Sequence, residues 1–158
     1  MSIAVYPGIA LIGAAMLFAA KARIEEEEIV LSEYEDMLRF LLHAKRSLSS
    51  FLLTPREICD SFVAQSAVIN GLKSRFADGR RDGLLENSRI AKADKNMLEG
   101  YFSRFGTSGY ECESEELDRV CAELEMRVRS VREQSEKSRK LIPVICVFAF
   151  VSLVLLIL

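Results

Sequence analysis

Residues 114–158 read SEELDRVCAELEMRVRSVREQSEKSRK followed by LIPVICVFAFVSLVLLIL, and this stretch predicts much of the architecture. In its first part apolar residues recur at helical spacing between polar ones: Leu117, Val120, Cys121, Leu124, Val128 and Val131. We expect Ser114 to cap this helix, because the residues after it are acidic and suit a helix N-terminus. Nothing breaks the pattern before Pro143, so the helix is predicted to continue into the apolar segment. A coiled-coil pairing of this helix stays an alternative.

Both ends of the chain are apolar, and all 21 basic and 23 acidic residues lie between Lys21 and Lys140. Each apolar end is about long enough to cross a hydrocarbon core of roughly 30 Å as a helix. The sequence therefore predicts a transmembrane helix over residues 1–22, a cytosolic helical domain over 23–138 and a second transmembrane helix over 139–158. A cleaved signal peptide is the alternative for the first segment, but no basic residue precedes its apolar run.

Basic residues flank both apolar ends on the side of the central domain. Lys21 and Arg23 follow the first segment, and Lys137, Arg139 and Lys140 precede the second. Because positively charged flanks tend to stay in the cytoplasm, the domain is expected to be cytoplasmic with both termini outside.

The central domain is predicted to be all-α, an antiparallel bundle whose first and last helices continue into the membrane. A helical pattern runs from Ile24 to about Ser50. Thr54, Pro55 and Glu57 then form a start signal, with Thr54 as N-cap and Glu57 closing a capping box. The helix that they begin is expected to carry these residues inward: Ile58, Phe62, Val63 and Ile69.

Two glycine-containing segments interrupt the rest of the domain. The run ADGRRDG over Ala77–Gly83 predicts a turn, since Gly79 and Gly83 can take a positive φ. It lacks the strand–loop–helix context of a phosphate-binding loop. A third helix is predicted from about Asn87 to Phe105, and Gly106 begins the loop that ends it.

No group of residues in the sequence predicts catalysis. His43 is expected to be an ordinary residue of an amphipathic helix, and Glu25–Glu28 to be a solvated helix turn rather than a cation site. The cysteines have no metal-binding spacing and are expected to be small buried or lipid-facing thiols: Cys59, Cys112, Cys121 and Cys146. We therefore predict no enzyme, cofactor, metal, nucleic acid or small-molecule substrate. A membrane-bound enzyme with an unrecognised site is the alternative.

The layout resembles the stage III sporulation protein AB family. The matching pieces are Leu38–Ser50 followed by Thr54-Pro55, and Asp94–Gly106 followed by the charged helix Ser114–Lys140. The loop Thr107–Glu113 is shorter than the corresponding loop of that family. The Thr54-Pro55 turn and Phe105-Gly106 are the structural motifs that carry this resemblance.

The resemblance implies a non-enzymatic adaptor of a channel complex between mother cell and forespore, in the mother-cell membrane facing the forespore. The family's cytosolic domain is similar to the helical domain of type II secretion and type IV pilus platform proteins. Its partners would be a hexameric secretion-type ATPase, the stage III sporulation AA protein, and other channel subunits. Arg80 and Arg81, in the turn expected to lie farthest from the membrane, are the predicted docking residues. A general membrane-anchored scaffold in cell-envelope or division assembly is the alternative.

Overall fold

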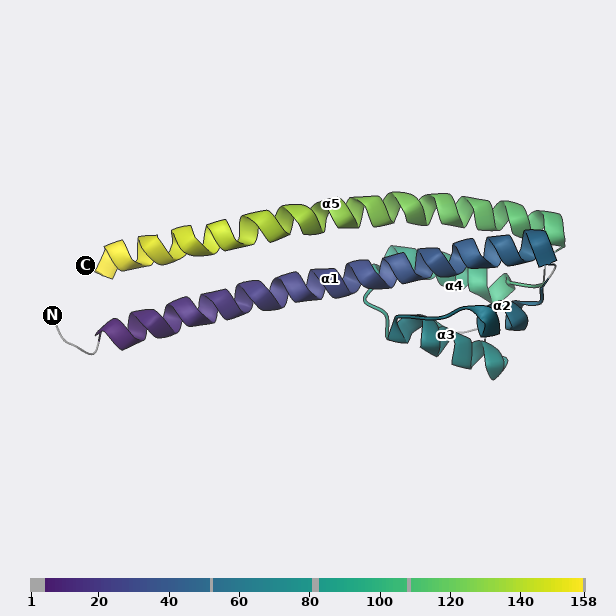
Figure 1. Cartoon of the computed structure of the whole chain (residues 1–158), viewed down its shortest axis with the longest axis horizontal. Helices are drawn as coiled ribbons and strands as arrows, with labels where there is room; N and C mark the ends of the chain where they lie inside the picture. Colours follow the sequence, from purple (N-terminus) through teal and green to yellow (C-terminus); the bar gives the residue numbers. More distant parts are fainter. Residues whose placement is uncertain (1–4, 52, 81–82, 108, 158) are drawn as a thin grey trace. The chain divides into compact units, whose positions relative to one another are not determined.

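The computed structural model describes residues 5–51, 53–80, 83–107 and 109–157. These residues form five helices and no strand (Figure 1), in the order α1 (Val5–Phe51), α2 (Pro55–Ser61), α3 (Ala67–Ala77), α4 (Lys92–Arg104) and α5 (Tyr110–Ile157). The predicted all-α class is confirmed, as is the continuation of the first and last helices through the charged and the apolar segments. Over the described part of the chain, no helix combines the length and the apolar character that crossing a membrane requires.

The chain divides into two compact units, described separately below. The first unit, called here the terminal unit, combines the part of the chain up to Ile29 with the part from Val131 onward. The second, called here the helical domain, is Val30–Ser130.

In the terminal unit, α1 and α5 run antiparallel and contact each other at several levels. A Cβ added to Gly13 would lie 2.7 Å from the ring of Phe150, so the absence of a side chain at Gly13 leaves room for that ring. The Cys146 thiol lies 4.0 Å from the Met16 carbonyl oxygen. Farther along, the Arg139 guanidinium lies 3.4 Å from the Glu28 carboxylate. The partners on α5 come earlier in the sequence as those on α1 come later, which is the order of an antiparallel pair.

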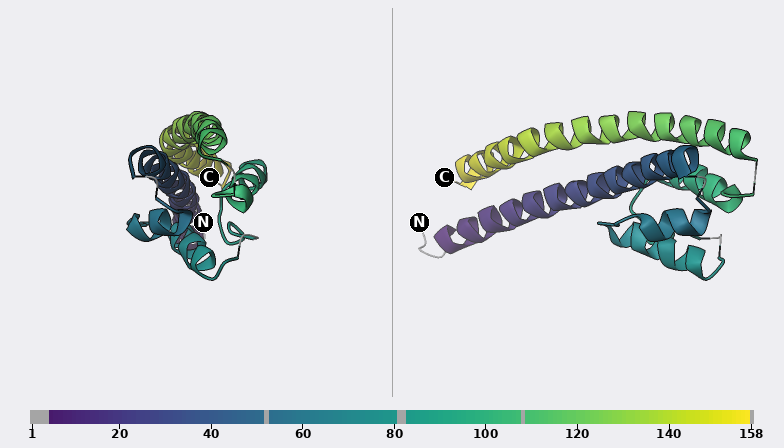
Figure 2. Two further views of the ribbon diagram at one scale, coloured as in Figure 1. Left: turned by 90° about the vertical axis from the view of Figure 1, so that its right-hand side faces the viewer. Right: turned by 45° about the vertical axis from the view of Figure 1, so that its right-hand side comes forward.

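The core of the helical domain draws buried side chains from all five helices, with α5 along one side of α1 and α2 and α3 along the other (Figures 1 and 2). Aromatic rings fill its centre, where Phe102 lies 6.0 Å from Phe40 and 5.3 Å from Tyr101, centroid to centroid. The predicted stripe of α5 is buried here, from Leu117 to Val128. Its last member, Val131, belongs to the terminal unit.

The predicted second helix is two helices in the structure. Helix α2 ends at Ser61, the backbone is extended at Phe62, and α3 begins at Ala67. Ile58 and Ile69 are buried as expected, but the prediction for Val63 is wrong, because its side chain is 84 % exposed. The physical reason lies on α1, where a buried carboxylate binds the chain just before α3.

Two predicted helix starts also differ from the structure. Helix α4 begins at Lys92 rather than near Asn87, because the preceding residues form a turn bound to α1. Helix α5 begins at Tyr110, one turn before the predicted cap Ser114, with Glu111 and Glu113 as the acidic residues of its first turn. The carboxylate of Glu113 binds the loop that precedes the helix, which explains the earlier start.

Candidate functional site

The structure brings the Thr-Pro turn and the Phe-Gly loop together, although they are far apart in the sequence. They line one cleft of about 220 Å³, formed by Thr54, Pro55, Arg56, Phe76, Gly79 and Gly106. Gly79 belongs to the predicted turn Ala77–Gly83, so the cleft joins three of the segments that the sequence singled out. Phe105 lies in the core beneath, with 1 % of its surface exposed. We call this feature the distal cleft.

The capping box predicted at the start of α2 is confirmed. The Glu57 backbone N–H donates to the Thr54 hydroxyl over 3.4 Å, and the Thr54 backbone N–H donates to the Glu57 carboxylate over 2.8 Å. Together these bonds hold the Thr54–Pro55 wall of the cleft. The Glu57 carboxylate accepts from the Thr54 backbone N–H and also, over 2.8 Å, from the Thr54 hydroxyl, and both bonds lower the pKa of Glu57 because they favour its charged form.

Gly106 forms the opposite wall of the cleft. Its φ is +77°, and a Cβ added there would overlap the Pro55 ring. Its backbone N–H donates to the Glu113 carboxylate over 2.5 Å. A glycine is required here for two independent reasons, the left-handed backbone and the close approach of Pro55.

The predicted docking arginines lie next to this cleft in the sequence. Arg80 is exposed, and its backbone N–H donates to the Arg75 carbonyl over 2.9 Å, which closes the turn after α3. Gly79 and Gly83 take the positive φ predicted for them, +72° and +60°. Arg81 lies outside the described residues. Arg56, which lines the cleft, is also exposed.

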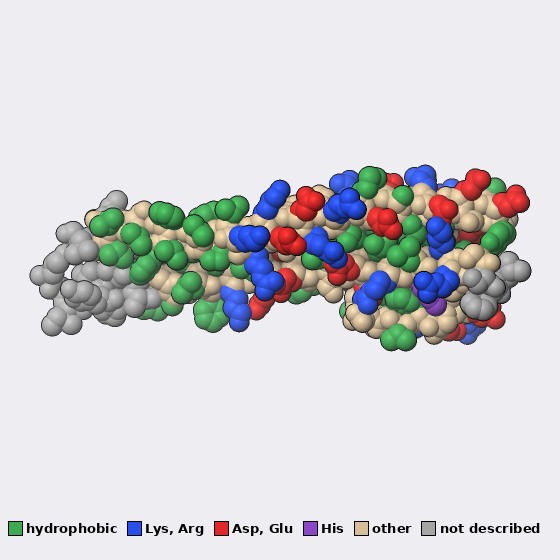
Figure 3. Space-filling model, turned by 45° about the horizontal axis from the view of Figure 1, so that its top comes forward, with side chains coloured by type: hydrophobic (Ala, Val, Ile, Leu, Met, Phe, Trp, Pro, Cys, Tyr) green, Lys and Arg blue, Asp and Glu red, His purple; other side chains and the backbone are tan. Residues whose placement is uncertain are grey.

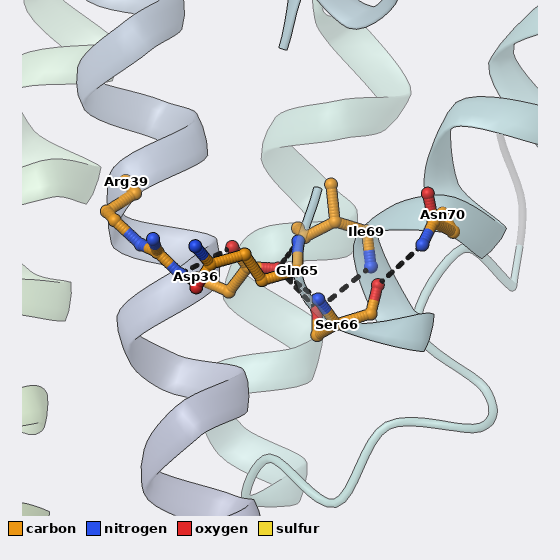
Figure 4. A network of polar contacts seen from close by, with 6 residues as sticks. All are labelled: Asp36, Arg39, Gln65, Ser66, Ile69 and Asn70. Carbon is orange, nitrogen blue, oxygen red and sulfur yellow. Dashed lines mark hydrogen bonds and ion pairs between the residues drawn. The ribbon is translucent and has the colours of Figure 1, made fainter. Parts of the chain in front are cut away.

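A second polar cluster lies on the inward face of α1, around the buried carboxylate of Asp36 (Figure 4). One oxygen, Oδ2, accepts from the Ser66 hydroxyl over 2.6 Å and from the Ser66 backbone N–H over 2.7 Å. It also accepts from the Gln65 backbone N–H over 3.2 Å, while Oδ1 accepts from Arg39 over 2.9 Å. Since Ser66 is the N-cap of α3, Asp36 fixes the point at which α3 begins.

Neighbouring residues of α1 bind the segment before α4 in the same way. The carboxylate of Glu33 accepts from the Arg89 backbone N–H over 2.6 Å. The Tyr34 hydroxyl donates to Asp94 over 2.6 Å and accepts from the Ala91 backbone N–H over 3.0 Å. Burial, and then the hydrogen bond to Asp94, raise the pKa of Tyr34 to about 12. The Asp94 carboxylate also binds Arg127 of α5 over 3.1 Å.

Sequence reasoning did not identify Glu33, Asp36 and Asp94 as structural residues, because acidic side chains on amphipathic helices are mostly solvated. One signal was present. Glu33 and Asp36 are three residues apart and lie on the same helical face as Met37 and Phe40, which are buried. An acidic residue within the apolar stripe of a helix is the pattern that would have found them.

The other candidate residues have local partners. His43 lies 2.9 Å from the Ser61 hydroxyl, and burial followed by the charge of Arg46 lowers its pKa. Glu25 and Glu27 pair with Lys21 and Arg23 over 3.6 Å each. Among the residues with a described placement, no group of three or more His, Cys, Asp and Glu side chains could hold a metal ion.

Burial raises the pKa of both Cys59 and Cys121 to about 11, so these thiols stay protonated at neutral pH. The described site combines a cleft lined by the exposed Arg56 with a frame held by buried carboxylates. In comparisons with protein-family models, curated proteins and solved structures, none matched this chain.

Proposed function

We propose that the chain is a non-enzymatic membrane adaptor that presents its helical domain in the cytoplasm to a hexameric secretion-type ATPase. The anchoring part of the proposal is supported by exposed apolar side chains in the terminal unit, and the docking part by the distal cleft. Sporulation, the mother-cell membrane facing the forespore and the other channel subunits come from the resemblance to the stage III sporulation protein AB family. That assignment is part of the proposal.

The apolar surface of the terminal unit is the observation on which anchoring depends. Both helices expose large apolar side chains, including Phe18 at 79 %, Phe148 at 70 % and Leu155 at 71 %. Figure 3 shows hydrophobic side chains gathered over one stretch of the surface, next to a band of Lys and Arg. A contiguous apolar surface of this kind is unfavourable in water, at about 25 cal/mol for each Å² left exposed. Two spanning helices in lipid would remove that cost.

The charges of the terminal unit support the orientation. On α1 the order along the helix is apolar residues, then Lys21 and Arg23, then the run Glu25–Glu28. On α5 the same order holds in reverse, with Arg139 and Lys140 next to the apolar end. Because basic residues next to a span favour the cytoplasmic side, both helices favour a cytoplasmic helical domain.

The distal cleft is the proposed docking surface. Arg56 lines it and Arg80 follows the lining residue Gly79 in the sequence; both are exposed and can bind carboxylates of a partner through charge-assisted hydrogen bonds. We include Arg81 from its position next to Arg80 in the sequence. The buried apolar stripes hold the bundle together, so a partner would bind this polar surface rather than separate the helices.

Topology reporters test the anchoring. A reporter that is active only outside the cytoplasm is expected to work when fused after Leu158 and to fail when inserted at Gly79, in the exposed turn. The reverse pattern would contradict the orientation. The helical domain would then lie outside the cytoplasm and could not bind the proposed ATPase there. Recovery of the full-length chain in the soluble fraction after cell lysis would contradict anchoring itself.

A charge-reversal variant tests the docking. Arg80→Glu with Arg81→Glu is expected to weaken capture of the purified ATPase and to reduce spore yield, while helicity and membrane insertion stay unchanged. The matched control is Arg46→Glu with Arg129→Glu, which reverses two exposed arginines on α1 and α5. Full spore yield after deletion of the whole gene would contradict the sporulation role. A division or envelope defect in that deletion strain would favour the general scaffold.

A further inference from the structure

A second cavity of the helical domain lies where α3 and the turn before α4 meet α1. Its volume is about 180 Å³, and its lining includes Glu33, Ala67, Val68, Gly71, Leu84 and Asn87. Half of its lining residues are apolar or glycine, the polar ones are Glu33, Arg75, Asn87 and Ser88, and the carboxylate of Glu33 is its acidic group. The described linings of this cavity and of the distal cleft share no residue, although α3 contributes to both. We call it the Glu33 pocket.

Glu33 has one carboxylate oxygen engaged and one available. Only 8 % of the residue is exposed, and both of its hydrogen bonds, from the Ser88 hydroxyl and the Arg89 backbone N–H, end on Oε2. The described residues contain one fully buried side-chain polar atom without a partner, and it is the Tyr101 hydroxyl. The second oxygen of Glu33 is therefore accessible, and the space that it borders is the pocket.

The charge of Glu33 is not paired within its own unit. No ion pair among the described residues includes Glu33. Arg75 also lines the pocket, but its guanidinium binds the Gly83 carbonyl and lies 3.4 Å from the Glu86 carboxylate. A carboxylate that is more than nine-tenths buried and borders an open pocket favours a cationic ligand, because the ligand restores the interactions lost with water.

We propose that the Glu33 pocket binds the ammonium group of a lysine side chain from a partner protein. The apolar wall of Ala67, Val68 and Leu84 suits the aliphatic stem of lysine. An arginine prefers to bind a carboxylate through both oxygens at once, and here one oxygen is already held by Ser88 and Arg89. A compact ammonium needs only the remaining oxygen. The proposal requires neither the membrane anchors nor the ATPase.

The test uses the purified full-length chain in detergent micelles and four small probes. They are n-butylammonium, a lysine blocked by acetyl and methylamide groups, n-butylguanidinium and n-butanol. The readout is the amide NMR signal of Arg89, whose N–H donates to Glu33. The two ammonium probes are expected to give saturable shifts and to bind more tightly than the guanidinium, and n-butanol is expected to give no shift.

Two variants remove the site in different ways. Glu33→Gln keeps an acceptor for Ser88 and Arg89 but removes the charge, and Gly71→Leu fills the pocket, since a Cβ at Gly71 meets nothing within 4 Å. Each is expected to weaken ammonium binding by about tenfold or more, the effect of losing one partner of a buried charge pair. Gly100→Leu is the matched control, because this helical glycine is also open but lies on α4 outside the described lining.

Several outcomes would overturn the proposal. Absence of a saturable shift with n-butylammonium would do so, as would unchanged binding in Gly71→Leu. Equal or tighter binding of the guanidinium would contradict the preference for lysine. Binding of n-butylammonium without the blocked lysine would show that a lysine on a polypeptide cannot reach Glu33, which excludes a partner protein.

Discussion

At the scale of single residues, the helical domain depends on acidic side chains that are buried rather than solvated. Asp36 is fully buried and accepts hydrogen bonds from Gln65, Ser66 and Arg39. Burying a carboxylate is unfavourable unless its hydrogen bonds are satisfied, and here protein groups replace the lost water. The charge of Asp36 therefore contributes to stability only as long as its partners stay in place.

Replacement of Asp36 measures this contribution. Asp36→Ala leaves the Gln65 and Ser66 N–H groups without their acceptor, and we expect the free energy of unfolding to fall by about 3 kcal/mol. The matched control is Asp118→Ala, whose side chain is 52 % exposed and pairs with Lys45. An exposed pair of this kind contributes about 1 kcal/mol or less. Urea unfolding followed by circular dichroism compares the two, and equal losses would contradict the assigned role of Asp36.

The thiols provide a prediction on pH dependence. Burial raises the pKa of Cys59 and Cys121 to about 11, so folding favours their protonated form. Their contribution to stability is complete below the unfolded-state pKa of about 8.5 and is lost as the pH rises toward 11. We expect the free energy of unfolding to fall over this range, and to fall less in the Cys59→Ala, Cys121→Ala double variant.

Alkylation followed by mass spectrometry checks the same thiols at a single pH. Cys112 is exposed and is expected to react quickly in the folded protein, whereas Cys59 and Cys121 are expected to react only after unfolding. Cys112→Ser is the control for the alkylation, since it removes the exposed thiol that is expected to react first. Labelling of Cys59 as fast as that of Cys112 would contradict its burial.

At the scale of helices, local signals predicted what local interactions determine. The capping box at Thr54 and Glu57 and the stripe Leu117–Val128 involve residues within one helix, so sequence spacing is enough to predict them. The break between α2 and α3 could not be predicted in this way. The group that fixes the start of α3 is Asp36, which lies 30 residues away from Ser66. No window of sequence around Val63 contains that information.

The candidate site also combines features that local sequence predicts with features that depend on how the helices pack. Its glycines, Gly79 and Gly106, and the Thr-Pro turn could be predicted, because each reflects a local backbone requirement. That these segments line one cleft could not, since their contact depends on how α2, α3 and the loop before α5 pack. The Glu33 pocket was missed for a further reason. Glu33 resembles the solvated run Glu25–Glu28 until the apolar face of α1 is known.

Gly106 tests the contact between two of these elements. Gly106→Ala places a Cβ against Pro55 at a positive φ, and we expect the free energy of unfolding to fall by about 2 kcal/mol or more. Gly109→Ala is the control, because a Cβ there meets nothing within 4 Å and no positive φ is involved. Its effect should stay within about 0.5 kcal/mol. Chemical denaturation measures the free energy of unfolding of both variants. Equal losses would contradict the close contact between Gly106 and Pro55.

The packing of α5 can be tested by comparing a substitution in its buried stripe with one on its exposed face. Leu124 is fully buried, so Leu124→Asp puts a carboxylate into the core without a partner, and we expect a loss of about 3–5 kcal/mol. Met126 is 68 % exposed on the same helix, and Met126→Asp should change stability by only about 0.5 kcal/mol. Thermal melting distinguishes them. Similar melting temperatures would mean that α5 does not pack on the domain as described.

At the scale of the whole molecule, the two compact units have different surfaces. The helical domain Val30–Ser130 buries its apolar stripes internally, whereas the terminal unit exposes apolar side chains along both of its helices. We therefore expect the helical domain to be the unit that folds on its own in water. The terminal unit needs a partner or lipid to cover its apolar surface.

A fragment tests this difference. Residues 30–130 alone are expected to be soluble, strongly helical and cooperative in melting, because the buried core lies within them. The control is residues 30–109, which lacks α5 and its stripe and should lose cooperative melting. Circular dichroism and calorimetry provide the measurement. A disordered 30–130 fragment would show that the terminal helices are required for the domain to fold.

The hydrogen bonds from α1 also have a consequence for the order of folding events. Glu33, Tyr34 and Asp36 bind groups that lie 55, 60 and 30 residues farther along the chain, at Ser88, Asp94 and Ser66. Closing such loops costs conformational entropy that a local helix does not require, so α1 can form before its partners arrive. Helices α3 and α4 would then dock onto it late, after the rate-limiting barrier. Damage to these bonds would leave the folding rate nearly unchanged and shorten the lifetime of the native state.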